Sequence, residues 1–336
     1  MSERNTQIDS LKFFLIFLVL VGHCLDIGLS SYLNNALFRF IYSFHMPVFV
    51  LLSGMMFKEK SFRALMGGGG ISLVATYLVF HLLYGGKTLA YTGGSVLYFW
   101  LKGFVYNATH LYDPADGLWY ILSLLFWRLF LNYTPKWIKE NIVLHLCVVL
   151  GISILAGLVP IGREISFQRT FAFYPYFVLG YYFKDVYSQL RKVPLIIPLG
   201  VILIYAIIVL YKTLPQINIL LQRTPYNYSE IVTSILNRCF FYIWTLPISL
   251  SIIAIFPNIK FFSQEGRYTL FYYMYHMFFV LFFRYLVINL GVTCNELSVL
   301  VYAIGSFVIM RLLRDIPMLY FMTSPLPKNI FVNHKQ

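Results

Sequence analysis

The sequence predicts an all-α, polytopic integral membrane protein with about ten transmembrane helices. Of its 336 residues, 59% are hydrophobic and only 12% are charged, and the mean hydropathy is +0.72. A soluble domain carries roughly 25% charged residues, so this chain has too little polar surface to cover a water-facing globule. The high hydrophobic content also excludes a disordered chain. Aromatic residues reach 19%, which suits lipid-facing surfaces and interfacial belts.

Ten stretches are apolar enough to be spans, since crossing the bilayer takes about 20 residues. They are residues 11–29, 36–57, 70–85, 118–133, 142–159, 171–187, 194–211, 236–256, 268–290 and 296–316. The first stretch is long enough to span, so we expect it to stay as an anchor and not to be a cleaved signal. Residues 1–336 are expected to form one transmembrane domain, with short cytoplasmic tails at 1–8 and 317–336.

The segment 95–107 is apolar but short, and it contains Lys102. If it does not span and the N-terminus is cytoplasmic, 16 of the 26 Lys and Arg residues lie in inner loops, seven lie outside and three lie within spans. Cytoplasmic loops carry the excess of positive charge. This division therefore favours ten helices with both termini cytoplasmic, and places 95–107 outside the bilayer core.

The net charge of +13 has the same explanation. In a soluble protein it would point to nucleic acid, but here the positive residues follow the membrane topology, so we expect no nucleic-acid partner. No pair of histidines has a spacing such as HExxH, no CxxC pair exists, and carboxylates at membrane depth are scarce. We therefore expect no bound metal. The hydrophobic composition leads us to expect membrane lipid around the protein.

Ionisable residues at membrane depth are costly and mark candidate sites. His23 lies toward the outer end of the first span, about 16 Å above Lys12 on the same helix face, and Asp9 can pair with Lys12. His45 lies near mid-bilayer in the second span, and His276 lies at depth in the ninth. The alternatives are that Lys12 is a snorkelling anchor and that the histidines only bond neighbouring helices.

The second span also ends in a basic cluster. Lys58, Lys60 and Arg63 crowd its inner end, and Ser53 and Gly54 form a small-residue patch where a helix or a thin ligand can approach closely. Positive charge at this end would attract an anionic substrate. The alternative is that the three cations only fix the topology.

The outer side carries two long stretches, 86–117 and 212–235, which are either substrate-docking loops or plain connectors. Trp119 and Tyr120 open the fourth span just after the first of them. These two aromatic residues are either interfacial anchors or part of a binding site.

Several fragments, in order, resemble the acyltransferase-3 family of bacterial membrane acyltransferases. In that family a basic residue is followed by ten positions and a histidine, as Lys12 and His23 are here. The similar strings are Asp9-x-Leu-Lys12, Phe44-His45-Met46-Pro47-x-Phe49 with Ser53-Gly54, Leu118-Trp119-Tyr120, Phe177-x-x-Gly180-Tyr181-x-Phe183 and Tyr275-His276. One departure is Lys12, where many members have arginine, because lysine keeps the charge but loses the planar fork.

The resemblance implies a membrane O-acyltransferase, similar to fucose 4-O-acetylase-like enzymes, in the bacterial cytoplasmic (inner) membrane. It would move an acetyl or other acyl group from cytoplasmic acetyl-CoA, a co-substrate, to a hydroxyl of a sugar, lipid-linked glycan or surface polysaccharide. An imidazole near neutral pH suits removal of the hydroxyl proton. We expect catalytic roles for His23, Asp9, Lys12 and His45, and donor or acceptor binding by Ser53, Lys58, Lys60, Arg63, Trp119, Tyr120 and His276.

A competing interpretation is a polytopic glycan flippase or polymerase with no acyl transfer. A polymerase would keep arginines in its outer loops, and Arg163, Arg169 and Arg223 are candidates. Protection of the purified protein by coenzyme A would separate the two classes, because only an acyltransferase needs that donor.

Overall fold

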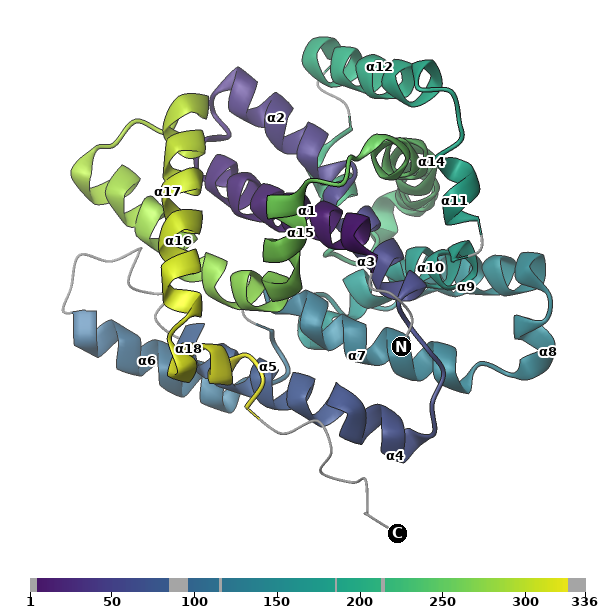
Figure 1. Ribbon diagram of the computed structural model, residues 1–336, viewed down its shortest axis with the longest axis horizontal. Helices are drawn as coiled ribbons and strands as arrows, with labels where there is room; N and C mark the ends of the chain where they lie inside the picture. Colours follow the sequence, from purple (N-terminus) through teal and green to yellow (C-terminus); the bar gives the residue numbers. More distant parts are fainter. Residues whose placement is uncertain (1–4, 85–95, 115–116, 185, 213–214, 326–336) are drawn as a thin grey trace.

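The computed structural model describes residues 5–84, 96–114, 117–184, 186–212 and 215–325. Within these residues every regular element is a helix, which confirms the all-α prediction (Figure 1). Five helical stretches are long and apolar enough to cross a membrane, so the chain is a multi-pass membrane protein. They are Thr6–Gly28, Tyr32–Met55, Tyr228–Ile255, Lys260–Leu290 and Glu296–Arg314.

Each of the ten predicted spans overlaps a helix, but not every helix is long enough to confirm a span. The helices are α1 (Thr6–Leu25), α2 (Tyr32–Tyr42) with α3 (His45–Met55), α5 (Ile71–Leu83), α7 (Trp119–Tyr133), α9 (Ile142–Ala156), α10 (Phe167–Phe183), α12 (Ile196–Lys212), α14 (Ile231–Ile255), α16 (Thr269–Leu290) and α17 (Glu296–Arg314). Helices α5, α7, α9, α10 and α12 have 13 to 17 residues, fewer than a span usually needs. The count of ten is therefore not confirmed.

Short helices connect these elements. They are α4 (Phe62–Leu65), α8 (Lys136–Lys139), α11 (Tyr187–Leu190), α13 (Ile217–Leu221), α15 (Lys260–Glu265) and α18 (Pro317–Met322). The segment predicted to lie outside the bilayer core forms α6 (Val96–Thr109), and the Lys102 side chain lies outside the described residues. The predicted tails also fall partly outside them, at residues 1–4 and 326–336.

The second predicted span is broken at Ser43 and Phe44, between α2 and α3. Pro47 explains the break, because its ring has no N–H and clashes with the carbonyl one turn back. Side chains bond to groups at the break: His45 Nδ1 lies 2.8 Å from the Ile41 carbonyl, and Trp244 Nε1 donates to Ser43 Oγ at 2.8 Å. Such replacement bonds let a helix break inside a membrane protein. The break also holds the His45 ring in the bundle interior.

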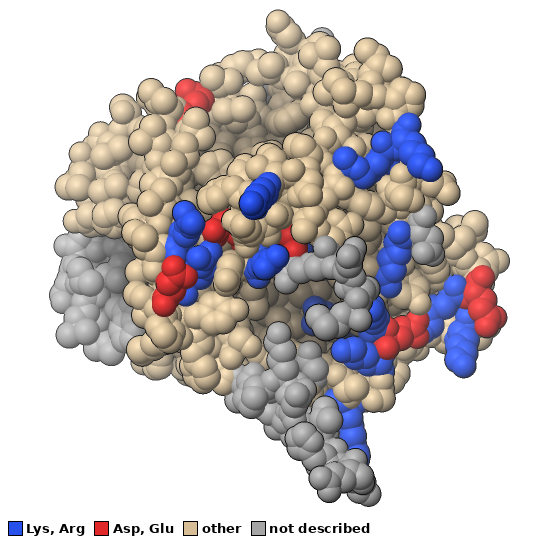
Figure 2. All heavy atoms as spheres, in the orientation of Figure 1, with Lys and Arg blue, Asp and Glu red and all other residues tan. Residues whose placement is uncertain are grey.

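The two ends of the bundle are distinguished by their polar contacts. At the end where α1 begins and α3 finishes, Lys139 pairs with Glu59 at 2.7 Å, and Lys184 donates to the Phe57 carbonyl at 2.5 Å. We call this the basic end, and Figure 2 shows Lys and Arg side chains across the middle of its face. We call the opposite end the cleft end. There the Asn34 side-chain amide donates a hydrogen bond to the Cys294 carbonyl at 2.9 Å.

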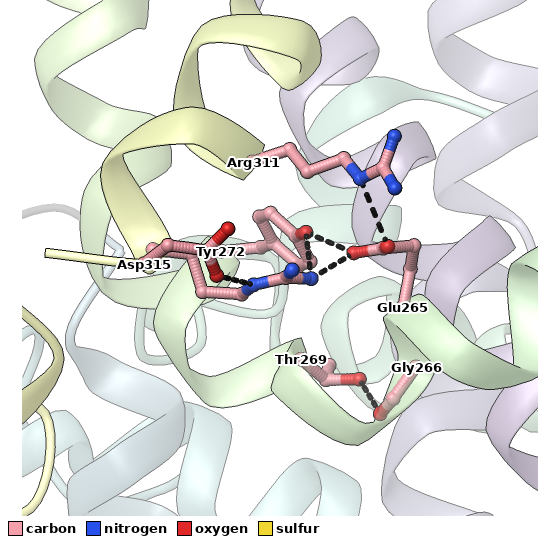
Figure 3. Close-up of polar contacts among 7 residues, drawn as sticks. Glu265, Gly266, Thr269, Tyr272, Arg311 and Asp315 are labelled. Atoms are coloured by element: carbon pink, nitrogen blue, oxygen red, sulfur yellow. Dashed lines mark hydrogen bonds and ion pairs between the residues drawn. The ribbon is translucent and has the colours of Figure 1, made fainter.

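A buried carboxylate ties three helices together at the basic end. Glu265 of α15 is 4% exposed and accepts from Arg314 of α17 at 2.5 Å and from Tyr272 of α16, while Arg311 lies 3.2 Å away (Figure 3). Asp315 takes a second bond from Arg314 at 3.1 Å. Two guanidinium groups compensate the burial of one carboxylate, so this cluster is structural.

Helices α3 and α10 approach each other at backbone level. A Cβ atom added to Gly54 would collide with the Phe177 carbonyl, and one added to Gly180 would collide with the Leu51 carbonyl. Small residues permit such close contact between membrane helices. The crossing brings together two of the sequence fragments that resemble the acyltransferase-3 family.

We expect the basic end to face the cytoplasm. In a variant without the native cysteines, Lys136→Cys is exposed on α8 and should react with an impermeant maleimide only after the cells are opened. Tyr228→Cys, at the other end and 59% exposed, should react in intact cells and serves as the control. Labelling of Lys136→Cys in intact cells would contradict this topology and the charge argument behind it.

Candidate functional site

A cleft opens at the cleft end of the bundle. Helix α1 contributes His23, the broken α2–α3 segment contributes His45, and α7 contributes Trp119. Arg169 of α10 and Tyr273 of α16 also line it. Three predicted site residues from three different helices are therefore brought to one cavity.

Backbone carbonyls orient two histidines of this region, His45 and His276. A carbonyl only accepts, so His45 Nδ1 donates to Ile41 at 2.8 Å and His276 Nδ1 donates to Tyr273 at 2.6 Å. In the neutral ring this leaves Nε2 as a proton acceptor. His276 is fully buried and lies behind the cleft, with its ring centre 5.4 Å from that of His23. Its Nε2 has no hydrogen-bond partner in the described part of the chain.

The structure keeps Asp9 and Lys12 away from the histidines. Lys12 Nζ lies 3.4 Å from Asp9 Oδ1, as the three-residue spacing predicts, and Asp9 is buried. The pair lies at the basic end of α1, about three helical turns from His23. Neither residue lines the cleft. Their predicted catalytic role therefore requires action at a distance from the imidazoles.

A second cavity opens at the basic end. Ser53, Lys58 and Lys60 line it, together with Arg128 of α7. Arg63, which the sequence grouped with the two lysines, lies exposed on α4 and does not line it. Arg128 is one of the three cations that lie within predicted spans, and charges at membrane depth mark functional sites. We call this cavity the basic pocket.

Tyr120 lies between the basic pocket and the cleft. Its hydroxyl is 2.5 Å from Ser53 Oγ, which lines the basic pocket. Its ring centre is 5.6 Å from that of Tyr273 and 6.0 Å from that of Trp119, and both of those residues line the cleft. The two aromatic residues predicted together therefore have different positions. Trp119 lines the cleft, and Tyr120 lies at the boundary between the cleft and the basic pocket.

A search against protein families matches residues 5–312 to an acyltransferase domain, that of the acyltransferase-3 family. The chain belongs to the acyltransferase-3 family. The match covers nearly the whole chain, so the histidines, the basic pocket and the α3–α10 crossing all lie within the acyltransferase domain.

Two relatives are both called nodulation protein NolL. The protein from Mesorhizobium japonicum is 25% identical over 193 residues, which are 55% of this chain and 49% of the relative. The protein from Sinorhizobium fredii is 28% identical over 203 residues, which are 56% of this chain and 51% of the relative. The chain thus aligns with about half the length of these relatives. No solved structure matches it.

Glu59, which lies between Lys58 and Lys60 in the sequence, fixes the rim of the acyltransferase's basic pocket through its hydrogen bonds. Partial burial alone would raise the pKa of this carboxyl, but Lys139 and Tyr181 donate to it at 2.7 and 2.6 Å and lower the pKa below its usual value. The carboxylate stays charged near neutral pH and fixes the loop. The neighbouring lysines are therefore carried on an anchored segment.

The described residues contain no group of three or more His, Cys, Asp or Glu side chains that could hold a metal ion. Two imidazoles, those of His23 and His45, line the cleft of this acyltransferase. The cleft is also lined by Asp26, Tyr42 and Arg223, which the sequence did not predict as part of an acyltransferase site.

Proposed function

We propose that this member of the acyltransferase-3 family is an O-acetyltransferase of the bacterial cytoplasmic membrane. It would carry an acetyl group from cytoplasmic acetyl-CoA to a hydroxyl of a sugar, either lipid-linked or in a surface polysaccharide. The observation that carries this proposal is that a basic pocket and a histidine-lined cleft open at opposite ends and meet at the Ser53–Tyr120 contact.

The basic pocket suits the donor. Coenzyme A carries several phosphate charges, and Lys58, Lys60 and Arg128 offer three cations at one opening. The acyl-pantetheine arm is thin and uncharged, so it fits the narrow approach to Tyr120 better than the nucleotide does. In this arrangement the thioester reaches the boundary with the cleft while the phosphates stay at the basic end.

The cleft suits the acceptor. We assign His23 as the base that takes the proton of the sugar hydroxyl, because its ring lines the cleft. The hydroxyl oxygen then bonds to the thioester carbonyl carbon, the carbon–sulfur bond breaks, and the sulfur leaves with the proton that the imidazole carried. The hydroxyls of Ser53 and Tyr120 would donate to the carbonyl oxygen as it gains negative charge. His276 is a positioning residue behind His23.

Replacing Lys58 and Lys60 together with glutamine should raise the KM for acetyl-CoA by at least tenfold and change kcat less. Each desolvated contact with a charged phosphate contributes about 1.5–3 kcal/mol, whereas exposed contacts contribute much less. Loss of binding that is equal in the ground and transition states appears in KM. Initial rates with purified protein and labelled acetyl-CoA measure both constants.

The matched control is Arg63→Gln, because Arg63 follows the same helix but lies outside the basic pocket. It should leave the KM unchanged. If the correctly inserted double variant and this control had the same KM for acetyl-CoA, the proposal that the basic pocket binds the donor would be refuted.

Mass spectrometry of the surface glycans of host cells with and without the protein tests the function as a whole. An acetyl ester that depends on both the protein and on His23 is the expected result. Glycans that keep all their esters but change in length or export, with a purified protein indifferent to coenzyme A, would instead support a flippase or polymerase.

A further inference from the structure

Three arginines surround the mouth of the cleft. Arg163, Arg169 and Arg223 line an opening that shares Trp119, Arg169 and Arg223 with the histidine-lined cleft. We call this opening the arginine mouth. It lies at the cleft end, far from the basic pocket, so the chain carries a separate concentration of positive charge where the acceptor would enter.

The arginines come from three segments that the fold brings together. Arg163 lies in the loop after α9, Arg169 lies in the first turn of α10, and Arg223 follows α13. Arg169 is held in place, because its guanidinium lies 4.8 Å from the centre of the Trp119 ring and its Nε donates to the Leu221 carbonyl at 3.0 Å. A fixed guanidinium loses less entropy when it binds an oxyanion.

The backbone at the arginine mouth is strained. The non-glycine residues with positive φ in the described chain are Ile165 at 47°, Ser166 at 59° and Gln222 at 47°. The first two follow Arg163, and the third immediately precedes Arg223. Left-handed conformations are unfavourable for such residues and gather at active sites and ligand-binding sites. The loops are thus held in the conformation that presents the arginines.

Ser166 supplies a second, independent sign of a ligand. Its side chain lines the arginine mouth and is 4% exposed, and its Oγ has no hydrogen-bond partner among the residues that the structure describes. A buried hydroxyl without a partner is costly and calls for an explanation. An anion held by the neighbouring arginines would accept its hydrogen bond.

None of the described residues that line the arginine mouth is a carboxylate. The Glu164 carboxylate beside it accepts a hydrogen bond from the Gly162 N–H at 2.8 Å, and Asp26 lines only the adjoining cleft. Three cations from three directions, with a hydroxyl beside them, match a tetrahedral phosphate or a diphosphate. A sugar carboxylate has two coplanar oxygens and one charge, so it would leave part of this donor set unused.

We propose that the arginine mouth binds a phosphate or diphosphate group of the acceptor, so that the sugar hydroxyl reaches the histidines in a fixed register. Calling the bound molecule the acceptor rests on the proposed function, whereas the anion site itself does not. The ligand class is a sugar joined to a phosphate, and a lipid carrier or a free sugar phosphate would both supply it.

The test uses the full chain in lipid nanodiscs, with coenzyme A saturating the basic pocket. Binding of inorganic pyrophosphate and of farnesyl diphosphate is measured directly, with farnesol and glucuronate as the neutral and carboxylate probes. The unsubstituted protein should bind the two diphosphates and neither of the other probes. Tighter binding of farnesyl diphosphate identifies a lipid carrier as the source, and equal binding identifies the phosphate group alone.

The Arg163→Gln/Arg223→Gln variant should weaken diphosphate binding at least tenfold, and Arg267→Gln, a matched loss of one exposed arginine at the basic end, should not. An unchanged affinity in the double variant, or binding of glucuronate as tight as that of pyrophosphate, would overturn the proposal. Unaltered coenzyme A affinity in the same variant shows that it is folded. Diphosphate binding without any acetyl transfer would refute the proposed function and leave the anion site standing.

Discussion

Replacing His23 with alanine is expected to abolish acetyl transfer while the protein remains folded and inserted. His23 is the imidazole that α1 presents to the cleft, with the His276 ring 5.4 Å behind it. A positioned general base contributes about 10²- to 10⁴-fold to the rate, so the variant should lose at least a hundredfold in kcat. Single-turnover transfer from labelled acetyl-CoA measures this loss.

The affinity of the His23→Ala variant for coenzyme A is the control, because the basic pocket lies at the other end of the bundle. It should match that of the unsubstituted protein. If the variant transferred acetyl at more than a small fraction of the normal rate, His23 would be structural, and the base would have to be His45 or His276.

Replacing Gly180 with leucine should prevent assembly of the bundle. A Cβ atom at this position already collides with the Leu51 carbonyl, and a backbone atom cannot move aside as a flexible side chain can. Forcing α3 and α10 apart would cost on the order of 3 kcal/mol or more, a large share of a typical folding free energy. Thermal unfolding of the detergent-solubilised protein should show a much lower Tm or no folded fraction.

Gly151 provides the matched control in α9. A Cβ atom there meets nothing within 4 Å, so Gly151→Ala should leave the Tm unchanged or raise it slightly, because alanine favours a helix by about 1 kcal/mol over glycine. A Gly180→Leu protein that unfolded at the same temperature as the Gly151→Ala protein would contradict the close approach of α3 and α10.

The sequence predicted the helices and the deep histidines because both depend on local properties. Apolar runs identify helices by composition, and an imidazole among aliphatic residues is recognisable without a fold. The break at Ser43 and Phe44 was harder to predict, since a proline in a membrane helix produces anything from a slight kink to a full break. Pro175 and Pro247 lie within unbroken helices of this same chain.

The sequence alone could not predict which distant segments meet at one site. Lys58, Lys60 and Arg63 form one cluster along the chain, but α4 turns Arg63 away, and the third cation of the basic pocket comes instead from α7. The arginine mouth is a similar case, because its arginines lie up to 60 positions apart and come from three different segments. Spacing along a chain indicates shared faces within one helix and says little about which helices meet.

The contact between Ser53 and Tyr120 has a consequence for the permeability of the bilayer. A basic pocket and a cleft that joined freely would form a water-filled pore, and protons would leak through it. With the Tyr120 ring between them and its hydroxyl bonded to Ser53 Oγ at 2.5 Å, the two cavities remain separate. Under the proposed function, an acetyl group would pass this barrier while both of its carriers stayed on their own sides. The reaction would then also carry the acetyl group across the membrane, without a separate transporter and without an open channel.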